Sequence, residues 1–299
     1  MLKKPLIIVL ILLCFSDFLS AQNKEVYISI ETALANKDKA HKLILSNNQL
    51  TRLPESIGNL KNLRILELHA NQLMELPESI GNLTNLEELV LWSGNLNNLP
   101  ESIGNLTNLK VIDIRYLQIN ILPESICKLI NLESLLLFQN NFTHLPLSIG
   151  NLINLQTLCL SQNNLAVLPE TIGNLKKLKR LDLHGNKLTK LPESISNLMD
   201  LQELNLFNNQ LINLPESMGN LRNLQILNLG WNQLTFLPNS IGELINSKEL
   251  YLHKNQLFHL PETFIDLKKL QRLTFTQNQI SVYEIERIKK MLPNCQFDL

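Results

Sequence analysis

The chain has 299 residues, 18% of them charged and 44% hydrophobic, and its 27 basic and 27 acidic residues give a formal net charge of +0. This balance argues against an electrostatic nucleic-acid binder, which would carry a basic face or stripe. Leucine (68) and asparagine (38) are abundant and glycine (10) is scarce, which argues against collagen and favours a repeat protein.

Residues 1–21 have the features of a secretory signal peptide. Lys3 and Lys4 give a positive start, residues 6–13 form an unbroken apolar run, and residues 19–21 offer small side chains for cleavage at the end of the segment. The run is too short to span a bilayer, which needs about 20 residues. We therefore predict an exported protein without a transmembrane segment, either secreted or held at the cell surface or in the periplasm.

A lipid anchor at Cys14 is the alternative localisation. It is less favoured because Leu13 stands where a lipoprotein signal needs a small residue. The cysteines Cys14, Cys127, Cys159 and Cys295 are far apart, without metal-ligand or redox spacing. The chain also lacks short catalytic motifs, so we predict no catalytic residues, no metal and no cofactor.

A period of 23 residues dominates the sequence: Leu-Pro recurs ten times from Leu53 to Leu260, always at this interval. Each unit also carries the pattern LxxLxLxxNxL. In the second copy it consists of Leu63, Leu66, Leu68, Asn71 and Leu73. These motifs resemble those of leucine-rich repeat proteins over about residues 40 to 280. The LPxxIGxLxxL half is similar to the subtype of exported bacterial repeat proteins and of Ras-binding intracellular scaffolds.

The residue pattern predicts the architecture independently of that resemblance. Alternate leucines such as Leu66 and Leu68 point the same way, as in a strand, and in-phase units place their strands side by side and parallel. The Pro-Glu-Ser-Ile-Gly-Asn-Leu half then crosses the far side, where the Ser or Thr is expected to cap a short helix or turn. One unit cannot bury enough apolar surface alone, so a stacked array needs caps.

We therefore predict an α/β fold, a curved leucine-rich repeat solenoid over residues 43–280. Its parallel sheet lines the concave face and short helices or turns line the convex face. Helical caps are expected at both ends, in residues 22–42 and in residues 281–299, where an amphipathic helix precedes a short strand.

Asparagine fills the turn position in nine copies, where its amide is expected to bond to backbone groups of its own and the next coil. Gly94 and Leu117 interrupt this row in adjacent copies. Two interpretations stay open: a locally irregular backbone, or a row that has decayed. Ser247 replaces a core leucine, which predicts a soft spot.

The concave face is the predicted binding surface, because its residues alternate with the inward leucines and include both tryptophans. Aromatic residues and arginine are enriched in interface hot spots. The predicted centre of the site consists of Val90, Trp92, Arg115, Tyr116, Leu136 and Phe138. Further predicted contacts are His184, Phe207, Trp231, Tyr251 and His253.

The resemblance implies a non-enzymatic protein–protein interaction module, with a host or extracellular protein as partner. An intracellular Ras-type regulatory scaffold is the alternative if the N-terminal signal is not functional. A third hypothesis takes Cys159, Asp182 and His184 as parts of a cysteine nucleophile. It is the weakest of the three, because a sheet face offers no pocket and no oxyanion hole.

Overall fold

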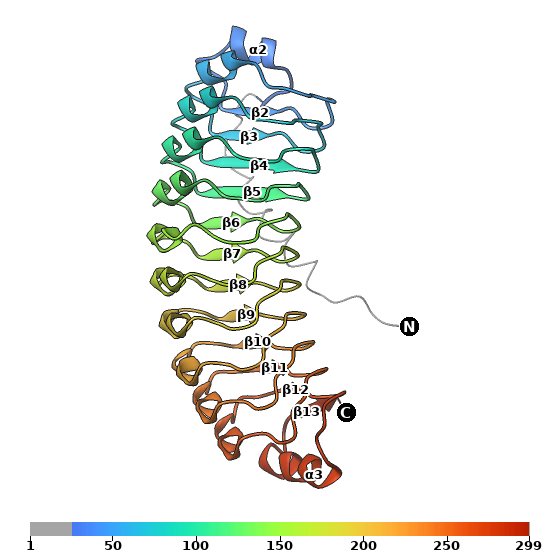
Figure 1. The fold of residues 1–299 in the computed structure, drawn as a ribbon. Coiled ribbons are helices and arrows are strands. Elements are labelled where there is room, and N and C mark those ends of the chain that lie inside the picture. Colours follow the sequence, from blue (N-terminus) through green and yellow to red (C-terminus); the bar gives the residue numbers. More distant parts are fainter. Residues whose placement is uncertain (1–25, 299) are drawn as a thin grey trace.

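A computed structural model of the chain describes residues 26–298, so the predicted signal peptide and Cys14 lie outside the described residues. The described chain forms one 13-stranded parallel sheet in which the strands follow sequence order (Figure 1). The strands are β1 (Val26–Tyr27), β2 (Lys42–Ile44), β3 (Ile65–Glu67), β4 (Glu88–Trp92), β5 (Val111–Arg115), β6 (Ser134–Leu136), β7 (Thr157–Cys159), β8 (Arg180–Asp182), β9 (Glu203–Asn205), β10 (Ile226–Asn228), β11 (Glu249–Tyr251), β12 (Arg272–Thr274) and β13 (Gln296–Asp298).

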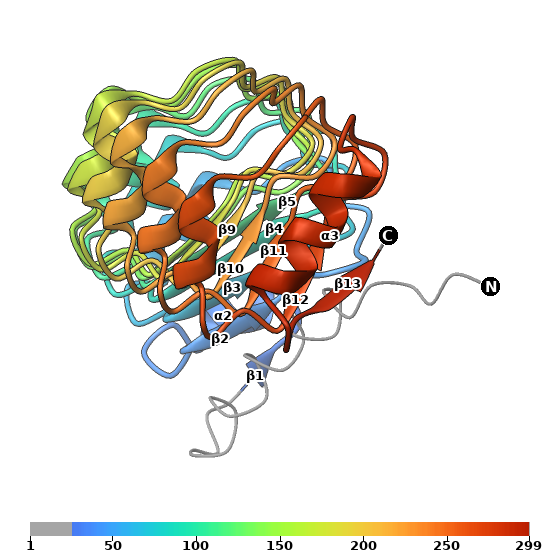
Figure 2. The same ribbon diagram turned by 90° about the horizontal axis from the view of Figure 1, so that it is seen from below.

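The 23-residue period sets the strand register. Leu66 lies opposite Leu89, and Leu204 lies opposite Leu227, so each residue pairs with its equivalent one copy later. The strands occupy one side of the stacked coils and the short helices the other (Figure 2). The predicted solenoid with a parallel sheet is therefore confirmed.

Within residues 26–298 the far side carries ten 3₁₀ helices of three or five residues. They are η1 (Glu55–Asn59), η2 (Glu78–Asn82), η3 (Glu101–Asn105), η4 (Glu124–Lys128), η5 (Ile149–Asn151), η6 (Glu170–Asn174), η7 (Glu193–Asn197), η8 (Glu216–Asn220), η9 (Asn239–Glu243) and η10 (Glu262–Asp266). In nine of them a proline occupies the position before the helix, where its fixed φ suits the entry.

The prediction that the serine of this half caps the helix is wrong. The hydroxyl of Ser102 is buried and has no hydrogen-bond partner, whereas Thr171 donates to the carbonyl oxygen of Leu147 in the preceding coil. The position instead packs against a glycine of the neighbouring coil. A Cβ on Gly81 would lie 2.6 Å from Ser102 Cβ, closer than side chains approach, so the small residues let successive helices stack.

The core is a continuous column of leucine side chains. Leu66, Leu89 and Leu181 are fully buried, as are their equivalents in the other coils. Ser247 sits inside this column at 2% exposure and donates to the carbonyl oxygen of Leu224 at 3.4 Å. A small polar side chain thus occupies a leucine position.

The asparagine row forms a buried hydrogen-bond ladder. Asn186 Nδ2 donates to the carbonyl oxygens of Leu183 and, in the preceding coil, Leu160, both at 2.9 Å. Its Oδ1 accepts from the backbone N–H of Leu165 at 3.0 Å. The same donor pattern recurs at Asn71, Asn140, Asn163, Asn209, Asn232, Asn255 and Asn278. The ladder satisfies backbone groups that the short strands leave unpaired.

The interruption at Gly94 and Leu117 leaves the turn conformation intact. Ser93 and Tyr116 have φ of 63° and 56°, as the equivalent Gln139 has 54° in a regular copy. Strands β4 and β5 are five residues long there, whereas β3 and β6 have three. A Cβ on Gly94 would lie 3.2 Å from the carbonyl oxygen of Asn71 and 3.4 Å from Leu117 Cδ2, so this glycine lies close to both flanking copies. The missing amides thus coincide with longer strand pairing, and the turn is not irregular.

A helix covers each end. At the start, α2 (Ile30–Ala35) is capped by Ser29, whose hydroxyl accepts from the N–H of Thr32. At the other end, α3 (Val282–Met291) is bonded to the last coil by Arg287, which forms an ion pair with Glu262 at 2.8 Å.

Candidate functional site

The predicted site residues all lie on the strands or in the three residues that follow them. Val90 and Trp92 belong to β4, Arg115 ends β5, and the register pairs Trp92 with Arg115. Val90 is buried at 9%, whereas Tyr116 and Trp231 are 46% and 45% exposed. The others are half-buried: Trp92, Arg115, Leu136, Phe138, His184, Phe207, Tyr251 and His253. Rings on this face form two groups, and Val90, Arg115, Leu136 and Tyr251 belong to neither.

We define the N-terminal aromatic group as His69, Trp92, Tyr116 and Phe138. The His69 and Trp92 rings stack in parallel, with centroids 4.4 Å apart and an interplanar angle of 3°. The edge of one ring faces the other in the Tyr116–Phe138 pair, at 5.0 Å and 89°. The prediction missed His69, although it occupies the same row as Trp92 one copy earlier.

Arg115 is held by a carboxylate of its own strand. Its Nε lies 2.5 Å from Asp113 Oδ1, and its Nη2 donates to Asp113 Oδ2 at 2.6 Å. Asp113 is 2% exposed, and this burial raises the pKa of its carboxyl, while the Arg115 charge acts in the opposite direction. Arg115 therefore serves first to neutralise a buried carboxylate.

We define the C-terminal aromatic group as His184, Phe207, Trp231 and His253. The ring of Phe207 lies 6.3 Å from His184, 6.2 Å from Trp231 and 5.8 Å from His253. Gly230 makes this arrangement possible, because a Cβ there would lie 2.5 Å from His253 Cε1. The side chain missing from Gly230 leaves the space that the His253 ring occupies.

Charged groups border the C-terminal aromatic group. Lys254 Nζ lies 3.4 Å from the centre of the Trp231 ring, a cation–π contact. Burial and the Lys254 charge lower the pKa of His253. Tyr251 lies beyond this group and donates its hydroxyl to Glu249. Burial and this bond raise the pKa of Tyr251 to about 12.

The set Cys159, Asp182 and His184 lacks the features of a cysteine nucleophile. The Cys159 thiol lies 3.3 Å from Ser161 Oγ and 3.9 Å from Asp182 Oδ2, and His184 Nδ1 lies 3.6 Å from Asp182 Oδ1. Burial, followed by the Asp182 charge, raises the pKa of Cys159 to about 11. Nucleophilic cysteines need the opposite shift, because the thiolate is the reactive form.

The described residues hold few other candidates for chemistry. Cys127, Cys159 and Cys295 are free thiols. Within residues 26–298, no group of three or more His, Cys, Asp or Glu side chains could hold a metal ion. None of the helices in that range is long and apolar enough to cross a membrane.

Two family descriptions match the chain. The family described as "Leucine-rich repeat region" matches residues 126–234, and "Leucine Rich Repeat" matches residues 40–60 and 62–83. No curated protein matches the chain.

Solved structures give three informative comparisons. A leucine-rich repeat protein of Leptospira interrogans is 30% identical, with coverage of 92% of this chain and 100% of that chain and a TM-score of 0.46. The plant peptide hormone receptor RGFR1 in complex with RGF2 is 32% identical, with a TM-score of 0.77, over 94% of this chain and 46% of that chain. Toll in the Drosophila Toll–Spatzle complex shares the fold at a TM-score of 0.80 and 20% identity, over 92% of this chain and 39% of that chain. The chain thus spans less than half the length of either receptor.

Proposed function

Because the chain belongs to the leucine-rich repeat proteins, we propose that it is a non-enzymatic module that binds a partner protein on its concave sheet face. The observation that carries the proposal is the pair of aromatic groups on that face. Stacked and edge-on rings that are half-buried or exposed on this face offer rigid apolar contact area, the typical composition of binding hot spots.

Two further observations support a binding role. The concave face is extended, and its strands keep one register across the solenoid, so side chains from many coils form one continuous surface. The plant receptor RGFR1, 32% identical over the shared region, is described in complex with RGF2. The likeness supports a protein or peptide ligand as the class of partner.

We also propose that the protein is exported, as the pattern of residues 1–21 predicts. N-terminal sequencing of the protein isolated from its native cells tests this. A mature chain that begins at Gln22, found outside the cytosol, supports export. A lipid-modified N-terminus at Cys14 would indicate the membrane-anchored alternative. A cytosolic chain that begins at Met1 would contradict export and favour the intracellular Ras-type scaffold.

The binding face is tested with three variants of equal melting temperature. One replaces Trp92 and Phe138 with alanine, and another replaces Phe207 and Trp231. Arg115 is left in place because its removal would leave the buried Asp113 carboxylate without its charged partner. The control replaces Phe236 and Phe258, which are 46% and 54% exposed and belong to neither aromatic group.

The partner is first captured from extracellular and cytosolic extracts and then titrated as a purified protein. We expect one or both concave variants to bind at least about 10-fold more weakly, since hot-spot truncations cost 2 kcal/mol or more. The control should bind as the wild type does. A partner that binds all variants equally would contradict the concave-face proposal.

A further inference from the structure

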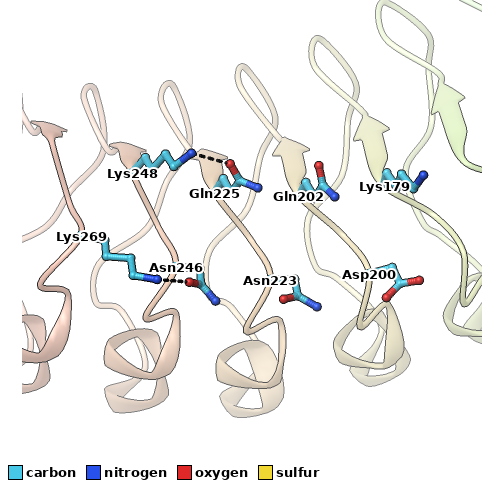
Figure 3. A pocket seen from close by; sticks show the side chains of 8 residues that line it. All are labelled: Lys179, Asp200, Gln202, Asn223, Gln225, Asn246, Lys248 and Lys269. Atoms are coloured by element: carbon cyan, nitrogen blue, oxygen red, sulfur yellow. Dashed lines mark hydrogen bonds between the residues drawn. The ribbon is translucent and has the colours of Figure 1, made fainter.

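A polar hollow lies on the flank of the solenoid where the chain runs from the 3₁₀ helices into the strands (Figure 3). It has a volume of about 550 Å³ and follows four successive coils. One row of side chains, from Lys179 to Lys248, directly precedes strands β8 to β11. The second row runs from Asp200 to Lys269. We call this hollow the flank groove; it is distinct from the concave face.

The flank groove is lined entirely by polar side chains, all of them Lys, Asp, Asn or Gln. Two of its amides are fixed by the backbone of the preceding coil: Asn223 Nδ2 donates to Met199 O and Asn246 Nδ2 donates to Arg222 O, both at 2.8 Å. This is a second in-phase asparagine row, separate from the buried ladder. Because the amides are fixed before a ligand arrives, binding them requires little ordering.

Three lysines of the groove have no carboxylate partner. Lys248 Nζ donates to Gln225 Oε1 at 2.9 Å and Lys269 Nζ to Asn246 Oδ1 at 2.6 Å, as Figure 3 shows. Lys179 Nζ donates to Gln156 Oε1 at 3.0 Å. Within residues 26–298 none of the three forms an ion pair. Against them stands one carboxylate, Asp200, so three positive charges and one negative charge leave the groove at about +2.

A neighbouring hollow on the same flank has a smaller excess of positive charge. It has a volume of about 320 Å³ and contains Lys110 and Lys177 with Glu133. Lys110 forms an ion pair with Glu87 at 2.9 Å. Its lining leaves about +1, and Lys177 donates to Asn154 Oδ1 at 2.7 Å, so the larger positive excess lies in the flank groove.

From this geometry we infer that the flank groove binds an acidic polysaccharide. Its amides and ammonium groups match a polymer that carries many hydroxyl groups and spaced carboxylate or sulfate groups. At a strand spacing of about 4.8 Å, four coils present repeated donors and acceptors over about 14 Å, which suits an extended chain. The groove has no apolar side chain to anchor a peptide and no aromatic ring to stack on a base.

The test measures binding of the purified protein to polygalacturonate by calorimetry at low salt. Neutral dextran and poly-glutamate serve as comparison polymers. The groove variant carries Lys179→Gln, Lys248→Gln and Lys269→Gln. A matched control carries the same change at the exposed residues Lys37, Lys128 and Lys190, so it removes the same amount of charge outside the groove.

We expect polygalacturonate to bind, dextran and poly-glutamate to bind at least about 10-fold more weakly, and the groove variant to lose at least about 10-fold in affinity while the control keeps it. Absence of polygalacturonate binding would overturn the inference. Equal losses in both variants would indicate a diffuse charge effect and would also overturn it. Equal binding of poly-glutamate would make the groove an acidic-peptide site instead. Because the concave variants keep these lysines, none of these outcomes bears on the proposed function.

Discussion

Two regions of the same solenoid solve one structural problem differently. In the intact region, from Asn140 to Asn278, each turn is held by an asparagine amide that bonds to two carbonyl groups and one N–H group. In the interrupted region, Gly94 and Leu117 replace the amides, strands β4 and β5 lengthen, and the turn keeps its positive φ. The comparison shows that the turn keeps its conformation without the amide where the adjacent strands are longer.

The first prediction makes the intact region imitate the interrupted one. Asn186→Leu removes a fully bonded amide where the preceding copy has Asn163 and not a glycine. We expect a loss of about 4 kcal/mol in the free energy of unfolding, because buried backbone groups of Leu160, Leu183 and Leu165 lose their partners. Denaturant titration measures it, with exposed Lys187→Gln as the control. A loss under about 1 kcal/mol would show that the ladder contributes little.

The second prediction concerns the charged pair of the interrupted region. Arg115→Ala leaves the buried Asp113 carboxylate unpaired, and we expect a loss of about 3 kcal/mol at neutral pH. Its measure is denaturant unfolding at a series of pH values.

The pH dependence of this variant follows from the Asp113 pKa, which burial raises and Arg115 opposes. Without Arg115 the pKa rises further. A carboxyl with a raised pKa contributes stability below its unfolded pKa of about 3.9, and this is lost as pH rises through the folded pKa. The deficit of Arg115→Ala should therefore shrink towards acid pH. The Asp113→Asn, Arg115→Ala double variant should show a constant difference from Asp113→Asn; if that difference varies equally with pH, Asp113 is not the titrating group.

The third prediction restores the amide in the interrupted region. Leu117→Asn regains the donors of the ladder but loses a side chain that is 6% exposed, so we expect a modest loss of about 1 kcal/mol. Adding Gly94→Asn should recover it, because the two positions then match the intact copies. Hydrogen exchange should show the ends of β4 and β5 opening more readily in the double variant. Unchanged protection of these backbone amides would show that the length of β4 and β5 does not depend on the missing asparagine side chains.

The fourth prediction has an effect of similar size but opposite sign and lies in the intact region. Ser247→Leu restores the leucine column, and we expect a gain of about 1 kcal/mol, since the fully buried equivalent Leu224 shows that the position suits leucine. Thermal unfolding measures it, with Ser247→Ala as the control for loss of the hydroxyl. A destabilised Ser247→Leu protein would mean that the surrounding side chains have closed over the site.

Much of the fold could be predicted because it repeats with the 23-residue period of the sequence. Strand positions, register, inward leucines and the asparagine row follow from residues 23 apart, such as Leu66 and Leu89, but the asparagine amides bond to the preceding coil and not, as predicted, to the next one. The capping role of the serines was predicted wrongly, because the sequence does not reveal that Gly81 lets the next coil approach so closely.

The candidate site was less predictable because it depends on side-chain conformations. Placement on the concave strands followed from alternation, but the contact between Phe207 and His253, two coils apart, depends on how the His253 ring fills the space beside Gly230. The pairing of Arg115 with Asp113 was likewise hidden, although the two lie two residues apart on one strand. The second asparagine row left a visible signal, in-phase asparagines such as Asn223 and Asn246, which the prediction did not use. The binding role of the concave residues stays a prediction.

The two end helices make the solenoid mechanically asymmetric. Helix α2 has six residues, whereas α3 has ten residues and its Arg287 forms ion pairs with Glu262 and Glu284. In an array whose units contact only their neighbours, fraying starts at the more weakly closed end and spreads one coil at a time. We therefore expect the described chain to unfold from β1 towards β13, so that the N-terminal aromatic group loses its structure before the C-terminal one.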